Sequence, residues 1–424
     1  MSYGDFSLKQ EFRPMLRVTL TLLLSLLLPD LYLYLVYITH RTKSFSWRAL
    51  YWIPSVLLTA IYLYFIYFTG GNALAHHTEA IGYLAIAVML MAVPKILLML
   101  CSVVGIAIRG LGRCLSKLLY HTAFKDPQPP FRVHRMPFTV TGIVLGLISF
   151  VNILFGAIEG ITHFEIKQVT YTSPDLPEAF DGYRILQLSD IHIGSWHHQP
   201  KAIQQMVNLV NEQKPDLIVF TGDLVNQQSH ELDAFQKVLS QLQAPDGVYS
   251  VLGNHDYGTY YHWNNPREEI ENMQHLLQSQ ADMGWKLLNN EHVILHQQND
   301  SIALIGVEND GEPPFPQHAD LERAMQGTES MFCILLSHNP THWRREVLPH
   351  SHIQLMLAGH THAMQMELFG RSLSALKYPE WSGLYLEGNR GLYVNVGIGY
   401  VGLPFRFGAW PEITVITLKS KEAE

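Results

Sequence analysis

The sequence has few cysteines and no strongly basic segment, and these absences exclude several kinds of protein. Its 424 residues include only three cysteines, Cys101, Cys114 and Cys333, which are scattered and odd in number. A disulfide framework or a zinc knuckle requires paired, closely spaced cysteines, so neither is expected. No block of Lys and Arg indicates a nucleic-acid partner, and the net charge of −8 identifies no other partner.

The two parts of the chain differ sharply in composition. Residues 1–160 are apolar and poor in acids, whereas residues 161–424 have the composition of an ordinary globular domain. Four apolar stretches are long enough for the roughly 20 helical residues that a hydrocarbon core requires. A cleaved signal peptide is a poor interpretation of the first stretch, because three more follow it. We therefore predict an α-helical transmembrane domain over 1–160, with spans at 18–39, 50–69, 80–108 and 138–160, followed by a domain over 161–424.

Lys and Arg in the segments between the spans predict the orientation, because cytoplasmic loops are enriched in these residues. The loops 40–49 and 109–137 hold nine of them, whereas the amino-terminal tail and the loop 70–79 together hold three. A multi-pass inner or plasma membrane protein is expected, with both termini and the globular domain outside the cytoplasm.

Two charged residues, Asp30 and Lys95, interrupt the apolar stretches near mid-span, each directly after a proline. A charge in lipid is costly and usually faces a partner or a cavity. We expect an ion pair between the first and third spans. It could line a lipid or substrate pocket, or be a purely structural contact; snorkelling at a helix break is the other interpretation.

Short apolar runs that end in polar residues predict strands in the second domain. They are "YRILQLSDIH", "PDLIVFTGD", "GVYSVLGNHD", "MFCILLSHNP" and "HIQLMLAGHTH". Together with the helical spacing of "PKAIQQMVNLVNEQ", these runs favour an α/β layering. Ligand sites collect at the carboxyl ends of strands in such sheets, so the polar ends are expected to converge. They contain Asp190, His192, Asp223, Asn254, His255, Asp256, His338, His360 and His362.

The donor types in these motifs indicate a metal site. Asp190 and His192, like His360 and His362, are two residues apart, so on an extended backbone each pair would share one face. Each motif alone could be an ordinary turn, but five in succession at strand ends favour one site. Imidazole, carboxylate and amide donors suit Mn²⁺, Fe²⁺, Zn²⁺ or Ni²⁺ rather than Ca²⁺. Seven donors with one bridging carboxylate would hold two such ions, which polarise a phosphoryl group and generate hydroxide.

The motifs "SDIHIG", "GDLVN", "GNHDY", "LSHNP" and "GHTH", in that order between residues 183 and 365, resemble those of the calcineurin-like metallophosphoesterase superfamily. The closing stretch from Ser382 and the predicted spans resemble its membrane-anchored bacterial branch, which includes enzymes acting on lipid-linked substrates. The resemblance implies two packed mixed β-sheets flanked by helices. It also implies hydrolysis of phosphate ester or pyrophosphate bonds by a metal-bridged hydroxide, without a covalent enzyme intermediate.

The resemblance also implies a role for each motif residue. His255 would bind no metal but would stabilise the transition state and protonate the leaving oxygen. Many relatives have a carboxylate at the position of Asn226, whose amide could still accept the imidazole N–H. Ala363 replaces a frequent glycine, from which we expect little. One metal would be bound by Asp190, His192, Asp223 and His362, and the other by Asp223, Asn254, His338 and His360.

The sequence identifies substrate-binding residues less clearly than metal ligands. His197, His198 and Arg406 are candidates for phosphate or lipid-headgroup contacts. A solvated loop for the histidines and a structural salt link for the arginine are the competing interpretations. The aromatic loop 256–266 could cap the site, touch the bilayer or pack as an ordinary loop.

The leading hypothesis is a membrane-anchored dinuclear phosphoesterase, with the lipid bilayer and a phosphorylated lipid or small molecule as its partners. One alternative is a nonspecific phosphatase or phosphodiesterase that is merely tethered to the membrane. The other is a transporter or sensor with a phosphate-binding regulatory domain, for which Asp30 and Lys95 are the only support in the sequence.

Overall fold

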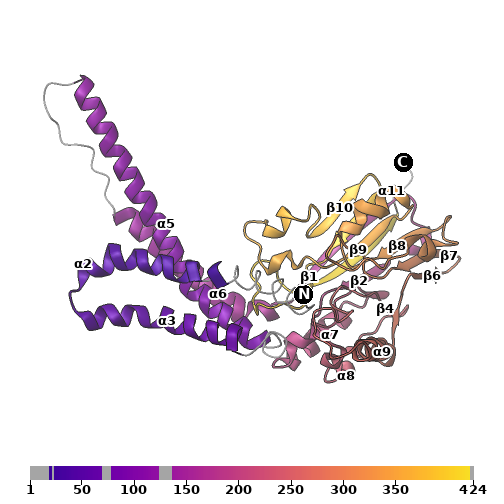
Figure 1. The fold of residues 1–424 in the computed structure, drawn as a ribbon. Coiled ribbons are helices and arrows are strands. Elements are labelled where there is room, and N and C mark those ends of the chain that lie inside the picture. Colours follow the sequence, from indigo (N-terminus) through magenta and orange to yellow (C-terminus); the bar gives the residue numbers. More distant parts are fainter. Residues whose placement is uncertain (1–18, 22, 69–77, 124–135, 421–424) are drawn as a thin grey trace, which may run out of the picture. The chain divides into compact units, whose positions relative to one another are not determined.

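The computed structural model describes residues 19–21, 23–68, 78–123 and 136–420 (Figure 1). The chain divides into two compact units, Met1–Phe155 and Gly156–Glu424. The division lies a few residues before the domain boundary expected from the composition.

Among the described residues, four helices are long and apolar enough to cross a membrane. The first, Thr19–Arg41, contains a π-helical turn at Tyr34–Ile38 and ends in α2 (Thr39–Arg41). The others lie within α3 (Phe45–Phe68), α5 (Thr78–Ala123) and α6 (Met136–Ile158). Each corresponds to one of the predicted spans, whose positions 18 and 69 lie outside the described residues.

Helix α5 is longer than the predicted third span. Its 46 residues correspond to about 69 Å of helix at 1.5 Å per residue, whereas a hydrocarbon core is about 30 Å thick. The helix therefore extends well beyond the length that a bilayer needs. Arg109, Arg113 and Lys117, which we expected in a loop, lie on its final turns. Arg109 and Arg113 lie within the candidate span Ala80–Leu115, and Lys117 follows it.

The expected ion pair between the first and third spans is present. Lys95 Nζ lies 2.7 Å from Asp30 Oδ1, and the Asp30 side chain is completely buried. Tyr51 on α3 donates a hydrogen bond to Asp30 Oδ1 at 3.0 Å, and Ser55 donates to the other carboxylate oxygen. The buried carboxylate is thus both paired and hydrogen-bonded, which offsets much of the cost of removing it from water.

Two six-stranded mixed sheets form the centre of the second unit (Figure 1). In spatial order, the first contains β1 (Glu165–Ser173), β12 (Glu412–Ser420), β2 (Arg184–Leu188), β3 (Leu217–Phe220), β4 (Val248–Ser250) and β5 (Trp285–Leu287). The second contains β10 (Gly383–Glu387), β11 (Arg390–Val394), β9 (Leu355–Ala358), β8 (Phe332–Leu336), β7 (Asp300–Gly306) and β6 (Glu291–Gln297). Strands β2 to β5 are mutually parallel, as are β7, β8, β9 and β11.

Apolar side chains of both sheets meet between them, for example Ile185, Leu217, Leu304, Ile334 and Leu357. The uninterrupted apolar runs recognised in the sequence are therefore strands that are buried on both faces. Helices α7 (Pro200–Glu212), α8 (Gln236–Leu239) and α9 (Pro266–Asp282) pack on the outer face of the first sheet. The other outer face is covered by α10 (Leu321–Met325), the π-helix Trp343–Val347 and α11 (Leu348–His350). This arrangement confirms the expected fold of two packed mixed sheets flanked by helices.

Candidate metal centre

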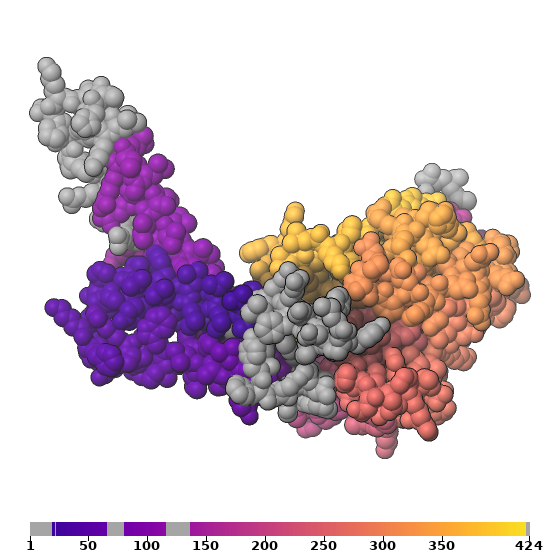
Figure 2. Space-filling model, viewed as in Figure 1, coloured from indigo at the N-terminus to yellow at the C-terminus, as the bar shows by residue number. Residues whose placement is uncertain are grey.

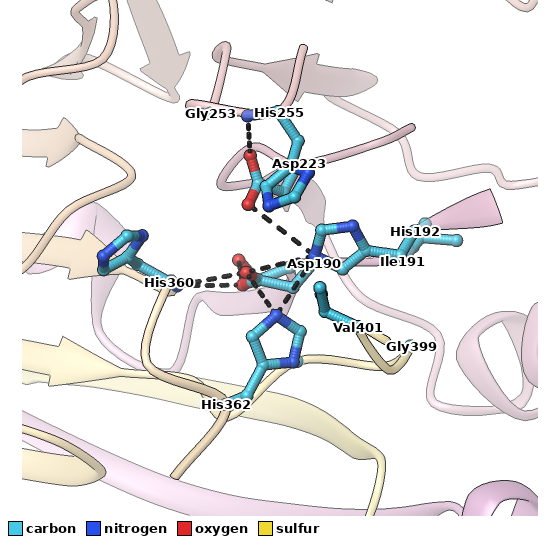
Figure 3. Close-up of polar contacts among 12 residues, drawn as sticks. Asp190, Ile191, His192, Asp223, Gly253, His255, His360, His362, Gly399 and Val401 are labelled. Atoms are coloured by element: carbon cyan, nitrogen blue, oxygen red, sulfur yellow. Dashed lines mark hydrogen bonds and ion pairs between the residues drawn. The ribbon is translucent and has the colours of Figure 1, made fainter. Parts of the chain in front are cut away.

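The polar motifs follow the carboxyl ends of parallel strands in both sheets. Two strand ends of the second sheet and three of the first contribute. Figure 3 shows the carboxylates of Asp190 and Asp223 and several imidazoles around one centre. Along the chain, Asp190 and His192 follow β2, Asp223 follows β3, Asn254 and His255 follow β4, His338 follows β8, and His360 and His362 follow β9.

The backbone at these motifs is not extended, so the alternation argument for the paired residues was wrong. β2 ends at Leu188 and β9 at Ala358. The φ angles are 51° at Asp190, 46° at His192, 75° at His360 and 48° at His362, all in the left-handed region that non-glycine residues seldom adopt. Left-handed turns, rather than strand alternation, direct these side chains into the centre.

Asp190, His192 and His362 form one group of candidate ligands. His362 Nε2 lies 3.2 Å from Asp190 Oδ1 and 3.1 Å from His192 Nε2. Their ligand atoms all lie within 4.8 Å of one another, and all three residues are buried. Two imidazole nitrogens that approach so closely are best accommodated when both direct lone pairs at a shared cation.

Asp223, His338 and His360 form the second group. His338 Nε2 lies 3.2 Å from Asp223 Oδ2 and 3.2 Å from His360 Nδ1. His192 Nε2 approaches the same Asp223 oxygen at 3.6 Å. Asp223 therefore lies between the two groups, where a carboxylate shared by two ions would lie. The Nδ1–H of His338 donates to the Thr221 carbonyl at 2.8 Å, which leaves its Nε2 facing the centre.

Asn254 supports the fit of these residues to bound ions. It is almost completely buried, and its Oδ1 has no hydrogen-bond partner among the described residues. Its Nδ2 donates to the Tyr260 hydroxyl at 3.0 Å, which fixes the orientation of the amide. An unpaired buried acceptor costs about 1–3 kcal/mol, and coordination of a cation would remove that cost. The donor set of the seven residues thus fits two divalent ions.

Burial and neighbouring charges set the protonation of the metal-free centre. Burial opposes ionisation of Asp190 and Asp223, but His362 and His338, respectively, outweigh it and hold the pKa of each carboxyl below its ordinary value. Burial, reinforced by the charge of His338, lowers the pKa of His360 to about 3. Burial also disfavours the cationic form of His338, yet the Asp223 carboxylate raises the pKa of His338 to about 9. Both carboxylates are therefore charged at neutral pH, and His338 carries a proton that an ion would displace.

His255 lies at the edge of the centre. Its Nδ1–H donates to the backbone carbonyl of Asn226 at 2.6 Å, so its Nε2 is free of that contact. The Asn226 amide instead contacts Ser195, accepting from its N–H at 3.2 Å and donating to its Oγ at 2.9 Å. The expected acceptor was therefore wrong: the main chain, not the amide side chain, accepts the imidazole N–H. His255 also lies within 4.8 Å of ligand atoms of His192 and Asp223, so its role as an acid rather than a ligand stays a prediction.

The three substrate-binding candidates lie in different surroundings. Arg406 is completely buried, and one of its terminal guanidinium nitrogens lies 3.0 Å from His362 Nδ1. Its remaining contacts are not with a carboxylate but with the carbonyls of Gly399, Val396 and Ala409. Arg406 thus lies behind His362. It is not exposed, as a substrate contact would be, and it does not form the salt link that was the competing interpretation. His197 and His198 are exposed just before α7, and their contact with substrate stays a prediction.

The centre is supported by three further residues, for which the sequence predicted no contact. The Tyr260 ring lies 4.3 Å from that of His255, so the aromatic loop does pack beside the site. The Tyr378 hydroxyl lies 3.0 Å from His360 Nε2, although no pattern in the surrounding sequence singles it out. Asp256 joins the turns after β3 and β4, because its carboxylate accepts the backbone N–H groups of Asp223, Leu224, Val225 and Gly253.

Glycines at two positions permit this close packing. A Cβ on Gly253 would collide with the Asp223 carboxylate. Gly222 has a φ of +95°, and a Cβ there would meet His338 Nδ1 at 2.8 Å. The glycines of "TGD" and "LGN" are therefore required by the approach of one motif to another.

Comparisons with known proteins agree with this architecture. Residues 183–364 match a family model described as calcineurin-like phosphoesterase, and residues 16–161 match one described as probable calcineurin-like phosphoesterase, transmembrane domain. The chain is 33% identical over 269 residues to the uncharacterized metallophosphoesterase YkuE of Bacillus subtilis, covering 60% of this chain and 86% of that protein.

Vertebrate proteins are similar as well. The chain is 34% identical over 283 residues to a transmembrane protein with metallophosphoesterase domain from Danio rerio, covering 64% of this chain and 61% of that protein. It therefore spans less than two thirds of that relative's length.

A solved metallophosphoesterase from Sphaerobacter thermophilus aligns over 51% of this chain and 77% of its own, with 18% identity and a TM-score of 0.26.

Proposed function

Because the chain belongs to the calcineurin-like metallophosphoesterase family, we propose that it is a membrane-tethered phosphoesterase that uses two divalent metal ions. The observation that carries this proposal is the convergence of two ligand groups, one buried and one largely buried, on Asp223. Such a centre suits in-line attack of water on a phosphoryl group.

Seven residues would hold the ions. Asp223 would contact both, and mixed imidazole, carboxylate and amide donors favour Mn²⁺, Fe²⁺, Zn²⁺ or Ni²⁺. When bound, the ions supply the charge that polarises the phosphoryl group and acidifies water. The proposed sets are Asp190, His192, Asp223 and His362 for one ion, and Asp223, Asn254, His338 and His360 for the other.

His255 would move the proton. Because its Nδ1–H donates to a carbonyl, only Nε2 can gain or lose a proton without breaking that contact. In its protonated form, Nε2–H would donate to the phosphoryl oxygens and then to the leaving oxygen. The Tyr260 ring against His255 restricts the orientation of the imidazole.

The proposed substrate is a phosphate ester or pyrophosphate carried by a lipid or a lipid-linked molecule. The four apolar helices and the match to a transmembrane phosphoesterase domain support it, since they hold the catalytic unit at a bilayer. The distribution of Lys and Arg supports a catalytic unit outside the cytoplasm.

The test is phosphate release by the purified full-length protein supplied with Mn²⁺. The substrates are diacyl phospholipids, lipid-linked pyrophosphates and a soluble aryl phosphodiester, and the controls are Asp223→Asn and His255→Ala. Release from a lipid that both substitutions abolish is the expected result. Release from the aryl diester alone would favour the nonspecific tethered enzyme. No release from any substrate by metal-loaded protein would count against the proposal.

A further inference from the structure

A short segment beside the metal centre exposes five large apolar side chains. We name Met364–Leu376 the apolar loop. Phe369 is fully exposed, Leu376 is 87% exposed, and Met364, Leu373 and Leu368 are 59%, 55% and 44% exposed. Single exposed apolar residues are ordinary on a protein surface, but five in one short loop favour an interaction site. In the space-filling view, the orange to yellow part of the chain that contains the loop forms part of the surface of its unit (Figure 2).

The tip of the apolar loop is held in an unfavourable conformation. Leu368 and Arg371 exchange backbone hydrogen bonds of 2.9 and 3.1 Å across a two-residue turn. The turn residues Phe369 and Gly370 have φ angles of 53° and 72°. Such turns favour Asn-Gly or Gly-Gly, and a bulky aromatic residue at positive φ is rare. Phe369 is thus disfavoured in water both by its backbone conformation and by its exposure, which indicates a function for the side chain.

The base of the loop is firmly attached, so the exposure of its tip is a feature of the fold. Glu367 N–H donates to the Phe407 carbonyl at 2.8 Å, and Phe407 N–H donates to the Gln365 carbonyl at 3.1 Å. The two ends of the loop lie close in the sequence to residues of the centre. The loop begins two residues after His362 and ends two residues before Tyr378, whose hydroxyl contacts His360. Both ends of the loop are therefore attached to the metal centre.

The charges around the apolar loop suit an anionic lipid surface. Arg371 and Lys377 are exposed at the tip and at the end, and Glu367 is the single acidic residue between Met364 and Lys377. The Lys377 ammonium lies 5.1 Å from the Phe315 ring and 5.2 Å from the Tyr378 ring, on the side of the loop that leads to the centre. Exposed aromatic and leucine side chains flanked by cations are typical of segments that enter the headgroup region.

We propose that the apolar loop inserts into the surface of a lipid bilayer and brings lipid to the metal centre. The bilayer is the occupant because the chain's own spanning helices keep one within reach of the loop's unit. Insertion itself does not depend on catalysis; delivery of a lipid substrate rests on the function proposed above.

A fluorescent label on the loop tests insertion directly. The full-length protein, with Cys101 and Cys114 changed to Ala and Cys333 left in its buried position, would carry an NBD label at Phe369→Cys. The matched control is Ile270→Cys on α9, a site that is 58% exposed. In nanodiscs of phosphatidylcholine and phosphatidylglycerol, we expect the label at position 369 to be blue-shifted and to be quenched by nitroxides on the acyl chains. The label at 270 should remain water-exposed. Equal, water-like emission at both positions would overturn the proposal.

Turnover tests delivery of lipid. The double variant Phe369→Ser with Leu376→Ser should lose about tenfold or more in turnover of a bilayer phosphoester, since it removes two apolar anchors. Turnover of the soluble aryl phosphodiester should be unchanged, and Ile270→Ser should change neither. Equal losses on both substrates, or no loss on the bilayer, would refute delivery. If the unmodified protein hydrolysed nothing, the proposed function would fail, yet the label would still decide whether the loop inserts.

Discussion

Neutralising Lys95 alone should destabilise the protein more than neutralising Asp30 and Lys95 together. The Asp30 carboxylate is completely buried and lies 2.7 Å from the Lys95 ammonium. Lys95→Met would leave that carboxylate with only the hydroxyls of Tyr51 and Ser55. Removing one partner of a buried ion pair costs about 3–5 kcal/mol. Because both hydroxyls remain, we expect the lower end, about 3 kcal/mol of unfolding free energy.

Neutralising Asp30 alone should have a similar effect on stability. Asp30→Asn would leave the Lys95 ammonium with the Ser55 hydroxyl at 3.3 Å. The double variant contains no charge at this position, and the amide introduced in place of the Asp30 carboxylate can accept from one of the two hydroxyls through its oxygen and donate to the other through its N–H. The double variant should therefore lose no more unfolding free energy than either single variant. This corresponds to a coupling energy between the two side chains of about 3 kcal/mol or more.

Unfolding of the four full-length proteins by SDS in mixed micelles, followed by tryptophan fluorescence, measures these differences. Losses that add in the double variant would refute the reasoning, because they would show that neither charge depends on the other. Phosphoester turnover of the same proteins separates a structural pair from a functional one. A double variant that is stable but inactive would support a role for the charges in handling a ligand.

Three further predictions concern the metal centre. His255→Ala should lower kcat by about 10²- to 10⁴-fold while the metal content, measured by mass spectrometry, stays at two ions; loss of an ion would make His255 a ligand. Since a protonated imidazole cannot bind metal and the pKa of His338 is about 9 without metal, affinity for Mn²⁺ should rise by about tenfold per pH unit up to that pH and then level off. Calorimetric titrations that show the same affinity at pH 7 and pH 9 would contradict this. Arg406→Lys, which cannot keep the contacts with the three carbonyls that hold the chain beside His362, should weaken metal binding by about 10- to 100-fold; an unchanged Kd would show that Arg406 does not position His362.

The sequence alone determined the division into membrane helices and an α/β unit. Hydropathy over about 20 residues is a local property, as is the apolar run of a buried strand, so both can be read without knowing the fold. The order of the five motifs was sufficient for the resemblance and, with it, for two packed mixed sheets. The pairing of Asp30 with Lys95 followed from the cost of an isolated charge in lipid.

Only the tertiary structure decided how the site residues are held. Asp190, His192, His360 and His362 lie on left-handed turns, because the strands end before them and tight packing fixes the backbone. The acceptor of the His255 N–H is a main-chain carbonyl, which side-chain identity at position 226 cannot reveal.

Contacts between distant segments were equally hidden in the sequence. Arg406 lies behind His362, and Tyr378 lies against His360, because turns after different strands meet at one edge. The exposure of Phe369 likewise depends on a turn whose conformation its own residue type disfavours. Local pattern therefore determined which chemistry the chain carries, whereas long-range packing determined which atoms face one another, since that geometry depends on residues far apart in the sequence.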